Sequence, residues 1–346
     1  MIVQSLFFPV AVAFLVAAGL TPLFARWARN HNLLDVPNAR SSHLVATPRT
    51  GGVAFVLGLV GGLAAFQMSG GGLTTTALLV VAAASGLALL GLADDLRPLP
   101  ASARLAVQVA ISTTLVLTVG AAPFPPLLGG WLGIVLTVFW LIAVTNAYNF
   151  MDGIDGMAAG QALVAGLGWA ALGTALGSRE TILLGVLVAA APAGFLLHNW
   201  PPARIFMGDA GSGFLGFFFG ALPLIPEHRG PHVMIWAALL MWPFLFDTTF
   251  TLLRRLRRGE NIVSAHRSHL YQRLIVSGLP QGRVSLLYSG LAAIGVGGAI
   301  AHAVGLPGAA RLSATVVAIA AVWLWRYVVA RESRPGIVSV RREPRP

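Results

Sequence analysis

The stretch LGGWLGIVLTVFWLIAVTNAYNFMDGIDG, residues 128–156, joins a long apolar run to a cluster of amide and carboxylate side chains. Residues 128–146 contain no charged side chain. A helix of about 20 apolar residues crosses the hydrocarbon core of a bilayer. The stretch therefore predicts a membrane-spanning helix that ends in a polar patch at the membrane surface.

The rest of the chain has the same character. Of its 346 residues, 56% are hydrophobic and only 10% are charged, whereas soluble proteins carry roughly 25% charged residues. We predict an all-α integral membrane protein with about eleven transmembrane helices and a cytoplasmic active-site cleft, as one domain over residues 1–330 with a basic, disordered tail at 331–346. The expected spans are 5–25, 50–68, 73–92, 104–121, 128–146, 158–176, 181–198, 212–226, 233–253, 285–304 and 308–328.

The basic residues predict the orientation. The net charge is +11, and all 23 basic residues are arginines. With the N-terminus outside, only Arg179, Arg229 and Arg311 lie on the outer side, and the other twenty lie inside or in the tail. This positive-inside bias predicts a periplasmic N-terminus and a cytoplasmic C-terminus in a multi-pass protein of the bacterial inner membrane. It also explains the charge without a nucleic-acid partner, since the arginines suit anionic membrane lipids.

The aspartates gather on the same predicted face. All seven fall at or just inside the cytoplasmic face of the membrane, whereas Glu180 and Glu227 fall in outer loops. Carboxylates near one membrane surface suit a divalent metal and a diphosphate substrate. The seven are Asp35, Asp94, Asp95, Asp152, Asp155, Asp209 and Asp247.

The motif LLGLADDLRPLP, residues 89–100, places Asp94 and Asp95 side by side after a span. Adjacent helical residues point about 100° apart, so both can face one partner only if the helix ends there. Two neighbouring anions beside a membrane are costly without a cation, which favours a functional pair over solvated caps.

The motif NAYNFMDGIDG, residues 146–156, predicts a polar helical stripe. Asn146, Asn149, Asp152 and Asp155 recur every third residue and would share one face if the helix continues. Their oxygens are ligands of the kind Mg²⁺ takes. The alternative is a polar turn between two spans.

The motif MGDAGSG, residues 207–213, places Asp209 in a glycine-rich turn before a helix. Its glycines would expose backbone N–H groups at a helix N-terminus, where phosphate oxygens bind. Asp247 lies about two turns inside a span, which predicts either a functional group or a structural partner for an arginine.

Two inner loops carry further candidates. In AHRSHLYQR, residues 265–273, we predict that His266, Arg267 and His269 recognise phosphate, with incidental surface histidines and a zinc site as the alternatives. In the loop of DVPNARSSH, residues 35–43, and TPRTGG, residues 47–52, Arg40, His43 and Arg49 are candidates for holding a lipid phosphate. The alternative is an ordinary positive-inside loop.

Together these motifs resemble the polyprenyl-phosphate N-acetylhexosamine-1-phosphate transferases, glycosyltransferase family 4. The resemblance runs from about residue 20 to residue 330, and its first loop is most similar to the branch that initiates O-antigen and related surface glycans. It rests on ADD at 93–95, NAYNFMDGIDG at 146–156, FMGDAGS at 206–212 and the HRSH loop, in that order.

The resemblance implies an Mg²⁺-dependent enzyme, with Mn²⁺ as an alternative metal. It would transfer a sugar-1-phosphate from a UDP-N-acetylhexosamine to undecaprenyl phosphate and release UMP. The implied metal ligands are Asn149 and Asp209, and Asn146 is a substrate-binding candidate. The implied catalytic residues are Asp94, Asp95, Asp152 and Asp155, and the implied substrate-binding loop holds His266, Arg267 and His269.

Two competing functions remain at this stage. A phospho-MurNAc-pentapeptide transferase belongs to the same family, but the run of consecutive histidines typical of it is absent. A transporter or lipid flippase would carry acids near the midplane and show internal symmetry, and neither is evident. Pro98 departs from the Lys or Asp common in the family three residues after the second aspartate. The sequence leaves the sugar and the oligomeric state open, a homodimer included.

Overall fold

The computed structural model describes residues 2–37, 45–124, 128–225, 230, 232–261, 264 and 266–333. They form a bundle of long helices with a short antiparallel strand pair, β1–β2, in which Leu34 lies opposite Pro48. The elements are α1 (Ile2–Asn30), β1 (Leu34–Asp35), β2 (Thr47–Pro48), α2 (Gly52–Met68), α3 (Thr75–Leu96), α4 (Ala101–Val119), α5 (Gly130–Met151), α6 (Met157–Leu176), α7 (Arg179–Asn199), α8 (Gly208–Ala221), the 3₁₀ turn η2 (Leu222–Leu224), α9 (Val233–Arg257), α10 (Leu270–Val276), α11 (Gln281–Ala303) and α12 (Ala309–Glu332).

The prediction of an all-α polytopic membrane protein is confirmed. Within the described residues, nine helices are long and apolar enough to cross a membrane. Helices also lie at the other two expected spans, but α2 has 17 residues and α8 has 14. The predicted number of eleven transmembrane helices is therefore not confirmed, although a helix lies at each predicted position.

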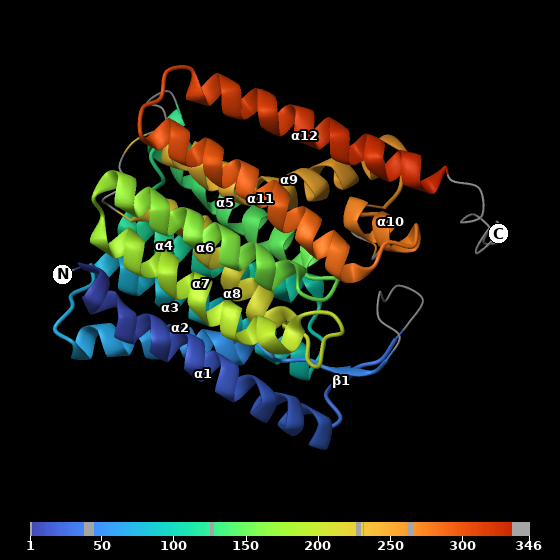
Figure 1. Ribbon diagram of the computed structural model, residues 1–346, viewed down its shortest axis with the longest axis horizontal. Coiled ribbons are helices and arrows are strands. Elements are labelled where there is room, and N and C mark those ends of the chain that lie inside the picture. The colour runs from blue at the N-terminus through green and yellow to red at the C-terminus, as the bar shows by residue number, and fades with distance from the viewer. Residues whose placement is uncertain are drawn as a thin grey trace.

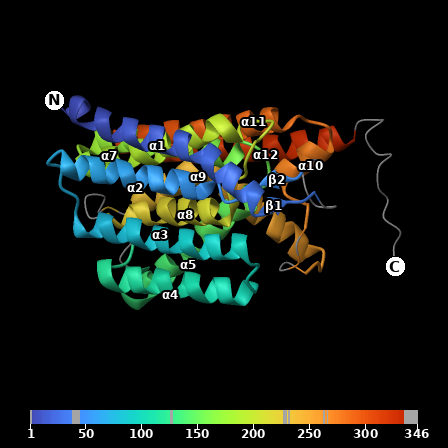
Figure 2. The same ribbon diagram turned by 90° about the horizontal axis from the view of Figure 1, so that it is seen from below.

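The long helices lie side by side, so that their ends gather at two opposite faces of the bundle (Figure 1). The strand pair and α10 lie at the right-hand end in that view, where α1 also ends. Seen from below, α3, α4 and α5 form one side of the bundle, and α8 lies next to α3 (Figure 2).

The short helix α8 is buried almost completely. Phe214, Phe217, Phe218 and Phe219 of its FLGFFF run are each at most 1% exposed. A helix that is apolar all round belongs in the interior of a bundle. Gly91 of α3 allows α8 to approach closely, because a Cβ atom there would collide with the Asp209 backbone. The first turn of α8 is thus held directly against the last turns of α3.

The end of the bundle opposite the aspartates has an acid–hydroxyl contact of its own. Glu180, in the first turn of α7, accepts hydrogen bonds from the Thr74 backbone N–H at 2.7 Å and from its hydroxyl at 2.9 Å. Thr74 in turn caps α3 by accepting from the Ala77 N–H. Glu180 therefore stabilises a helix junction and stands apart from the acidic cluster.

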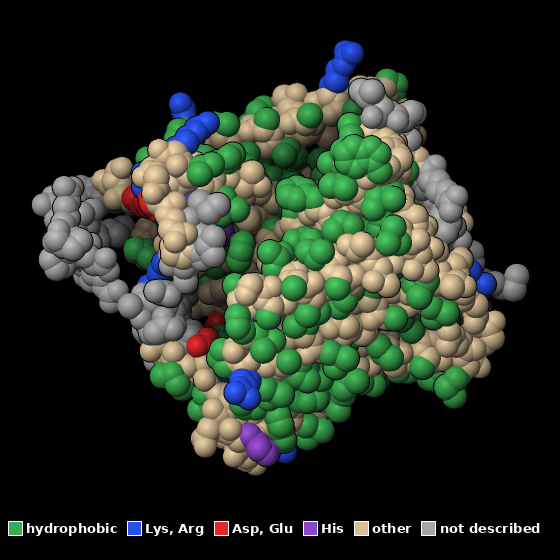
Figure 3. Space-filling view, turned by 180° about the vertical axis from the view of Figure 1, so that it is seen from behind, with side chains coloured by type: hydrophobic (Ala, Val, Ile, Leu, Met, Phe, Trp, Pro, Cys, Tyr) green, Lys and Arg blue, Asp and Glu red, His purple; other side chains and the backbone are tan. Residues whose placement is uncertain are grey.

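The surface separates apolar from acidic side chains. In the view from behind, hydrophobic side chains spread over the middle of the molecule, and the acidic side chains in view lie at its left-hand end (Figure 3). Exposed apolar side chains of this extent are what a lipid-facing surface requires.

Candidate active site

The two adjacent aspartates at the end of α3 face different partners. Asp95 is 4% exposed and accepts hydrogen bonds from the backbone N–H groups of Asp209, at 3.1 Å, and Ala210, at 3.2 Å. It therefore caps the N-terminus of α8, where a negative charge is favoured by the helix dipole. A Cβ atom at Gly208, whose φ is +71°, would lie 2.5 Å from the Asp95 Oδ2 atom, so glycine is needed for this contact.

This cap corrects one prediction from the glycine-rich turn. We expected the N-terminal amides of α8 to be open to substrate phosphate, but two of them are bonded to Asp95. A carboxylate already provides the anion that this helix end favours. The turn contributes Asp209 to the site, and its first amides hold the helix to α3.

Asp94 points instead toward Arg104 of α4. Its Oδ1 atom accepts from the Leu99 backbone N–H at 2.6 Å, and its Oδ2 atom accepts from Arg104 Nη1 at 2.7 Å. The same Nη1 atom donates to Asp209 Oδ2 at 3.0 Å. One guanidinium nitrogen therefore lies between two carboxylates from separate helices.

Arg104 is a site residue that the sequence analysis missed. It was counted with the arginines that set the orientation, because a single basic residue at the start of a span carries no other signal. The turn between α3 and α4 brings it back to the aspartate pair, since the Asp94 carboxylate holds the Leu99 N–H within that turn.

The amide side chains of α5 face the same region. Asn149 Nδ2 donates to Asp209 Oδ1 and to Ser212 Oγ, both at 2.9 Å. One turn earlier, Asn146 Nδ2 donates to Gln108 Oε1 of α4 at 2.7 Å. The predicted association of Asn149 with Asp209 is present in the structure.

The predicted four-residue stripe is wrong. Helix α5 ends at Met151, and Asp152 is its C-cap with φ −85° and ψ 52°. Asp155 lies in the following turn, where its Oδ2 atom accepts from the Ala203 N–H at 2.8 Å. Only the two asparagines share a helical face, because the helix ends at Met151 and the chain turns before α6 begins, with Gly156 at φ +75°.

Asp152 and Asp155 therefore have different environments. Asp155 is 8% exposed, and its backbone oxygen also accepts from Ser285 Oγ at 2.7 Å, so it joins the α5–α6 turn to α11 and to the loop after α7. Asp152 lies among other carboxylates. Burial raises its pKa well above the usual value, and the charges of Asp209, Asp95 and Asp155 raise it further.

The histidine loop is held by Asp247 of α9. This carboxylate is fully buried and accepts hydrogen bonds from the Leu270 N–H at 2.8 Å, the Tyr271 N–H at 3.1 Å and the Tyr288 hydroxyl at 2.6 Å. His269 Nδ1 lies 3.2 Å from its Oδ1 atom. Asp247 thus anchors the start of α10, which makes it a structural partner of the loop and not of an arginine.

His266 and His269 lie next to each other, with ring centroids 4.9 Å apart. Burial, followed by the charge of His269, lowers the pKa of His266 to about 4, so its imidazole is neutral at pH 7. Arg267 lies between them in sequence, and its Nε atom is buried without a hydrogen-bond partner in the described part of the chain. Within those same residues, no group of three His, Asp or Glu side chains could hold a metal ion, so zinc gains no support.

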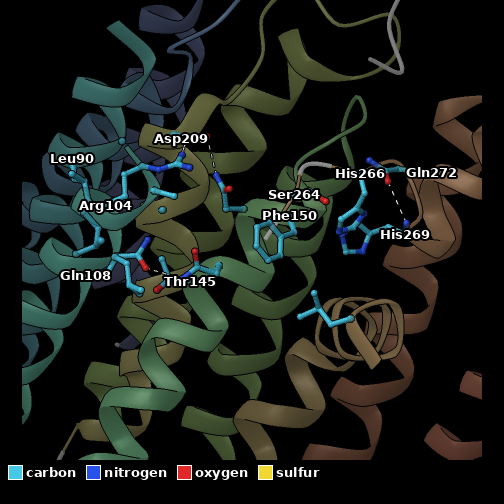
Figure 4. A pocket seen from close by; sticks show the side chains of 18 residues that line it. Leu90, Arg104, Gln108, Thr145, Phe150, Asp209, Ser264, His266, His269 and Gln272 are labelled. Carbon is cyan, nitrogen blue, oxygen red and sulfur yellow. Dashed lines mark hydrogen bonds and ion pairs between the residues drawn. The ribbon is translucent and has the colours of Figure 1, made fainter. Parts of the chain in front are cut away.

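A cavity of about 550 Å³ lies between the Arg104–Asp209 pair and the histidines of the loop. Figure 4 shows Arg104 and Asp209 on one wall, with His266, His269 and Gln272 on the opposite wall. Asn146 and Asn149 line it from α5. Its apolar wall consists of Leu87, Leu90, Leu105, Phe150 and Leu252.

Two predicted substrate contacts cannot be placed. Arg40 and His43 lie outside the described residues. The segment that follows them is placed, because the N–H groups of Gly51 and Gly52 donate to the backbone oxygens of Phe206 and Met207 at 2.9 and 2.8 Å. The end of the first loop is therefore attached just before Asp209.

Comparison with known proteins gives the family. A family model described as glycosyl transferase family 4 matches residues 77–226. A probable undecaprenyl-phosphate N-acetylglucosaminyl 1-phosphate transferase of Bacillus subtilis (strain 168) is 33% identical over 286 residues, covering 80% of this chain and 78% of the relative. The protein belongs to glycosyl transferase family 4.

Two other relatives show how broad the similarity is within the family. A decaprenyl-phosphate N-acetylglucosaminephosphotransferase of Mycolicibacterium smegmatis is 31% identical over 321 residues, covering 80% of this chain and 78% of the relative. A phospho-N-acetylmuramoyl-pentapeptide-transferase of Moorella thermoacetica is 32% identical over 282 residues, covering 73% and 84%. The family predicted from the motifs is thus confirmed, and this chain is a membrane transferase.

The family match covers the acidic part of the cavity. Residues 77–226 include α3, α4, α5 and α8, and the lining residues Arg104, Asn149 and Asp209 come from this segment. Asp94 of α3 lies behind them, bonded to Arg104. The histidine loop lies beyond that match, and Asp247 attaches it to the same cavity. In this glycosyl transferase, the site is therefore assembled from the matched segment and from a loop that lies beyond it in the sequence and includes His266 and His269.

Proposed function

We propose that the protein transfers an N-acetylhexosamine-1-phosphate from a UDP-sugar to undecaprenyl phosphate and releases UMP. This would be the first membrane step in the synthesis of an O-antigen-type cell-surface polysaccharide. The observation that carries the proposal is the cavity, which has charged and amide groups at one end and a leucine wall beside them. The names of the Bacillus subtilis relative and of a Thermotoga maritima relative, 29% identical, support the acceptor and the sugar phosphate.

The cavity suits a lipid phosphate acceptor. Leu87 and Leu90 of α3 and Leu105 of α4 provide apolar surface beside Arg104. Leu105 is 48% exposed, so this wall continues onto the outer surface of α4. A polyprenyl chain can lie along that surface while its phosphate reaches Arg104, since guanidinium groups bind phosphate oxygens through paired N–H donors.

We propose that Mg²⁺, or Mn²⁺ in its place, binds at Asp209 and Asn149. The residues present fit such an ion, because Asp209 and Asp94 already share one cationic nitrogen at 3.0 and 2.7 Å. Mg²⁺ commonly binds one or two carboxylates together with substrate phosphates and water, so a larger set of acidic ligands is not needed. When bound, the ion would neutralise charge on the diphosphate and on the departing UMP.

The chain's own residues then position two polyanions. An oxygen of the acceptor phosphate forms a bond to the sugar-linked phosphorus, and the bond from that phosphorus to the bridging oxygen breaks, leaving UMP with the electron pair. Arg104 would counter the acceptor's charge, and Arg267 with the neutral His266 would donate hydrogen bonds to the diphosphate. Because a phosphate monoester has its second pKa near 6, the acceptor is already an anion at neutral pH and needs no strong base.

The geometry favours Asp94 over Asp95 as the residue that meets the acceptor. Asp94 shares Arg104 with Asp209, whereas both oxygens of Asp95 accept backbone N–H groups. We infer that Asp94 positions Arg104 and the lipid phosphate, and that Asp95 supports the site by capping α8. Asp152, half-buried beside these carboxylates, is the remaining candidate for a catalytic carboxyl.

We also propose that the cavity faces the cytoplasm of a bacterial cell, in the inner membrane. The arginine distribution supports this, as does the chemistry, since nucleotide sugars are made inside the cell. Single cysteines at positions 230 and 260 provide a test in this cysteine-free chain. An impermeant thiol reagent added to intact cells should label position 230 and spare position 260, and the opposite pattern would reverse the orientation.

The function is tested with membranes that contain the protein. They are incubated with undecaprenyl phosphate, Mg²⁺ and one radiolabelled UDP-sugar at a time, and product is extracted into organic solvent. We expect a lipid-linked sugar phosphate and an equal amount of UMP from a UDP-N-acetylhexosamine, with neither product formed by an Asp209→Asn control. Transfer only from UDP-MurNAc-pentapeptide would identify the other branch of the family, and no transfer from any donor would refute the proposal.

A further inference from the structure

A second, smaller cavity lies at the same end of the bundle, away from the site described above. It has a volume of about 180 Å³ and shares no lining residue with the larger cavity. At about 30 Å³ for each water molecule in the liquid, it has room for a small polyatomic anion with some water. Its lining residues are Pro22, Ala25, Arg26, Arg29, His198, Arg204 and Ile205.

Three of these residues are arginines from two distant segments. Arg26 and Arg29 are three residues apart in the last turns of α1 and therefore share one face of that helix. Arg204 comes from the loop that follows α7, about 175 residues further along. The two segments are held together beside the cavity, where His198 Nε2 lies 3.1 Å from the Ala18 backbone oxygen.

The loop that carries Arg204 is fixed on both sides. The Arg204 N–H donates to the His198 oxygen at 2.9 Å, and Asn199 Nδ2 donates to the Ile205 oxygen at 3.0 Å. The Ala203 N–H donates to Asp155, as described above. The third guanidinium is therefore delivered to the cavity by backbone that is bonded in place.

Within the described residues, the positive charge at this cavity has no acidic partner. In the part of the chain that the structure describes, no acidic side chain pairs with Arg26, Arg29 or Arg204. Like charges three residues apart on a helix repel each other, and a third converging charge adds to that repulsion. Arginines that only set membrane orientation have no need to converge on one cavity.

The cavity also has an apolar side, formed by Pro22, Ala25 and Ile205. Its lining residues come from the last turns of α1 and α7 and from the loop after α7. In Figure 1, α1 ends at the same end of the bundle as the strand pair. We infer that this is the level at which the spanning helices leave the hydrocarbon core. An acidic phospholipid suits this arrangement, because its phosphate can bind the guanidinium groups while its glycerol contacts the apolar side of the cavity.

We propose that this pocket binds a phosphate group, and that the phosphate belongs to an acidic phospholipid of the surrounding membrane. The bound phosphate would hold the end of α1 against the loop 200–207. That loop leads within a few residues to Asp209, and its Phe206 N–H donates to the Pro48 oxygen at 2.8 Å. Lipid binding would therefore stabilise the segment from which α8 and Asp209 begin.

The test uses the full-length protein in nanodiscs. The pocket variant carries Arg26→Gln, Arg29→Gln and Arg204→Gln. Its matched control loses the same charge from exposed positions at the same end of the bundle, Arg257→Gln, Arg258→Gln and Arg283→Gln. Size-exclusion elution of both variants is checked first, and Arg204→Gln alone is the milder variant if the triple one does not fold.

Retention of phosphatidylglycerol is measured by native mass spectrometry, together with thermal unfolding in phosphatidylglycerol and in phosphatidylcholine. Each arginine is expected to contribute about fivefold to the affinity for the acidic lipid. The pocket variant should therefore bind phosphatidylglycerol roughly 100-fold more weakly, while the affinity of the control stays near that of the wild type. Inorganic phosphate added to phosphatidylcholine nanodiscs separates the sources: stabilisation of the wild type there identifies free phosphate as the ligand, and stabilisation only by phosphatidylglycerol identifies the head group. An equal loss of lipid binding in both variants, or no loss in either, would overturn the proposal.

Discussion

Replacing Asp247 by asparagine is predicted to loosen the histidine loop while leaving the helices in place. The carboxylate is 0% exposed, and its Oδ1 atom accepts from the Leu270 N–H and from His269. Its Oδ2 atom accepts from the Tyr271 N–H and the Tyr288 hydroxyl. An asparagine can accept at only one of these two positions, because its other terminal group is an N–H₂ donor.

The magnitude follows from the groups that lose a partner. If the amide nitrogen takes the Oδ2 position, the Tyr288 hydroxyl can rotate and accept from it, but the Tyr271 N–H is left buried and unpaired. That costs about 1–3 kcal/mol, and the remaining hydrogen bonds weaken because the acceptor is no longer charged. We expect a total loss of about 2–4 kcal/mol in the free energy of unfolding, concentrated at the start of α10.

The assay is limited trypsin digestion of the purified protein, combined with thermal unfolding. Arg267 lies three residues before α10, so detachment of the loop should speed cleavage after Arg267 and lower activity by raising KM for the UDP-sugar. The matched control is Thr251→Val, which removes one hydroxyl donor to the same carboxylate and should cost about 1 kcal/mol or less. If Asp247→Asn is as stable, as resistant to trypsin and as active as that control, the anchoring role is wrong.

Three further outcomes are expected. Asp95→Asn should lower the unfolding temperature with partial retention of activity, because it weakens the α8 cap by about 1 kcal/mol, whereas Asp94→Asn should remove most activity with little change in unfolding. Arg104→Gln should cut turnover by about 100-fold or more but cost under about 1 kcal/mol of stability, since its side chain is 36% exposed; unchanged turnover would exclude it from the acceptor site. The pKa of His266 in the folded protein, about 4, lies below the ordinary 6.5, so its contribution to stability is present above pH 6.5 and is lost as the pH falls toward 4. The wild type should therefore lose more stability than His266→Gln between pH 7.5 and pH 5. Parallel curves of unfolding free energy against pH would contradict the buried, neutral imidazole.

The fold class was predictable because it depends on the hydrophobicity of runs of about 20 residues and not on any single residue. Every expected span contains a helix, since an apolar run of this length leaves the backbone no alternative in a membrane. The lengths were less predictable. Helix α8 has 14 residues because it begins at Gly208, before the expected span, and because the 3₁₀ turn η2 replaces it at Leu222–Leu224.

The sequence predicted which residues form the candidate site better than it predicted how they are arranged. Asn149 and Asp209 were expected to meet, and they do. The continuation of α5 through Asp155 was wrong, because the local spacing of three residues does not reveal that the helix ends at Met151. Arg104 was missed for a related reason: its partners lie 10 and 105 residues away, and no local pattern encodes such contacts.

The hydrogen bonds of the aspartates divide them by function in a way the sequence could not. Asp95, Asp155 and Asp247 each accept backbone N–H groups from another segment, and a substrate or cation cannot replace a backbone group without opening the fold. In the described part of the chain, the Asp209 carboxylate is bound only by side chains, those of Asn149 and Arg104, and side chains can exchange partners when an ion or a phosphate enters. Asp94 combines both, with one oxygen held by the Leu99 N–H and the other on Arg104. Besides Asp152, which remains a candidate, we therefore expect the charge available for chemistry to be that of Asp209 and one oxygen of Asp94. The carboxylates fixed to backbone keep α8, the α5–α6 turn and the histidine loop around it.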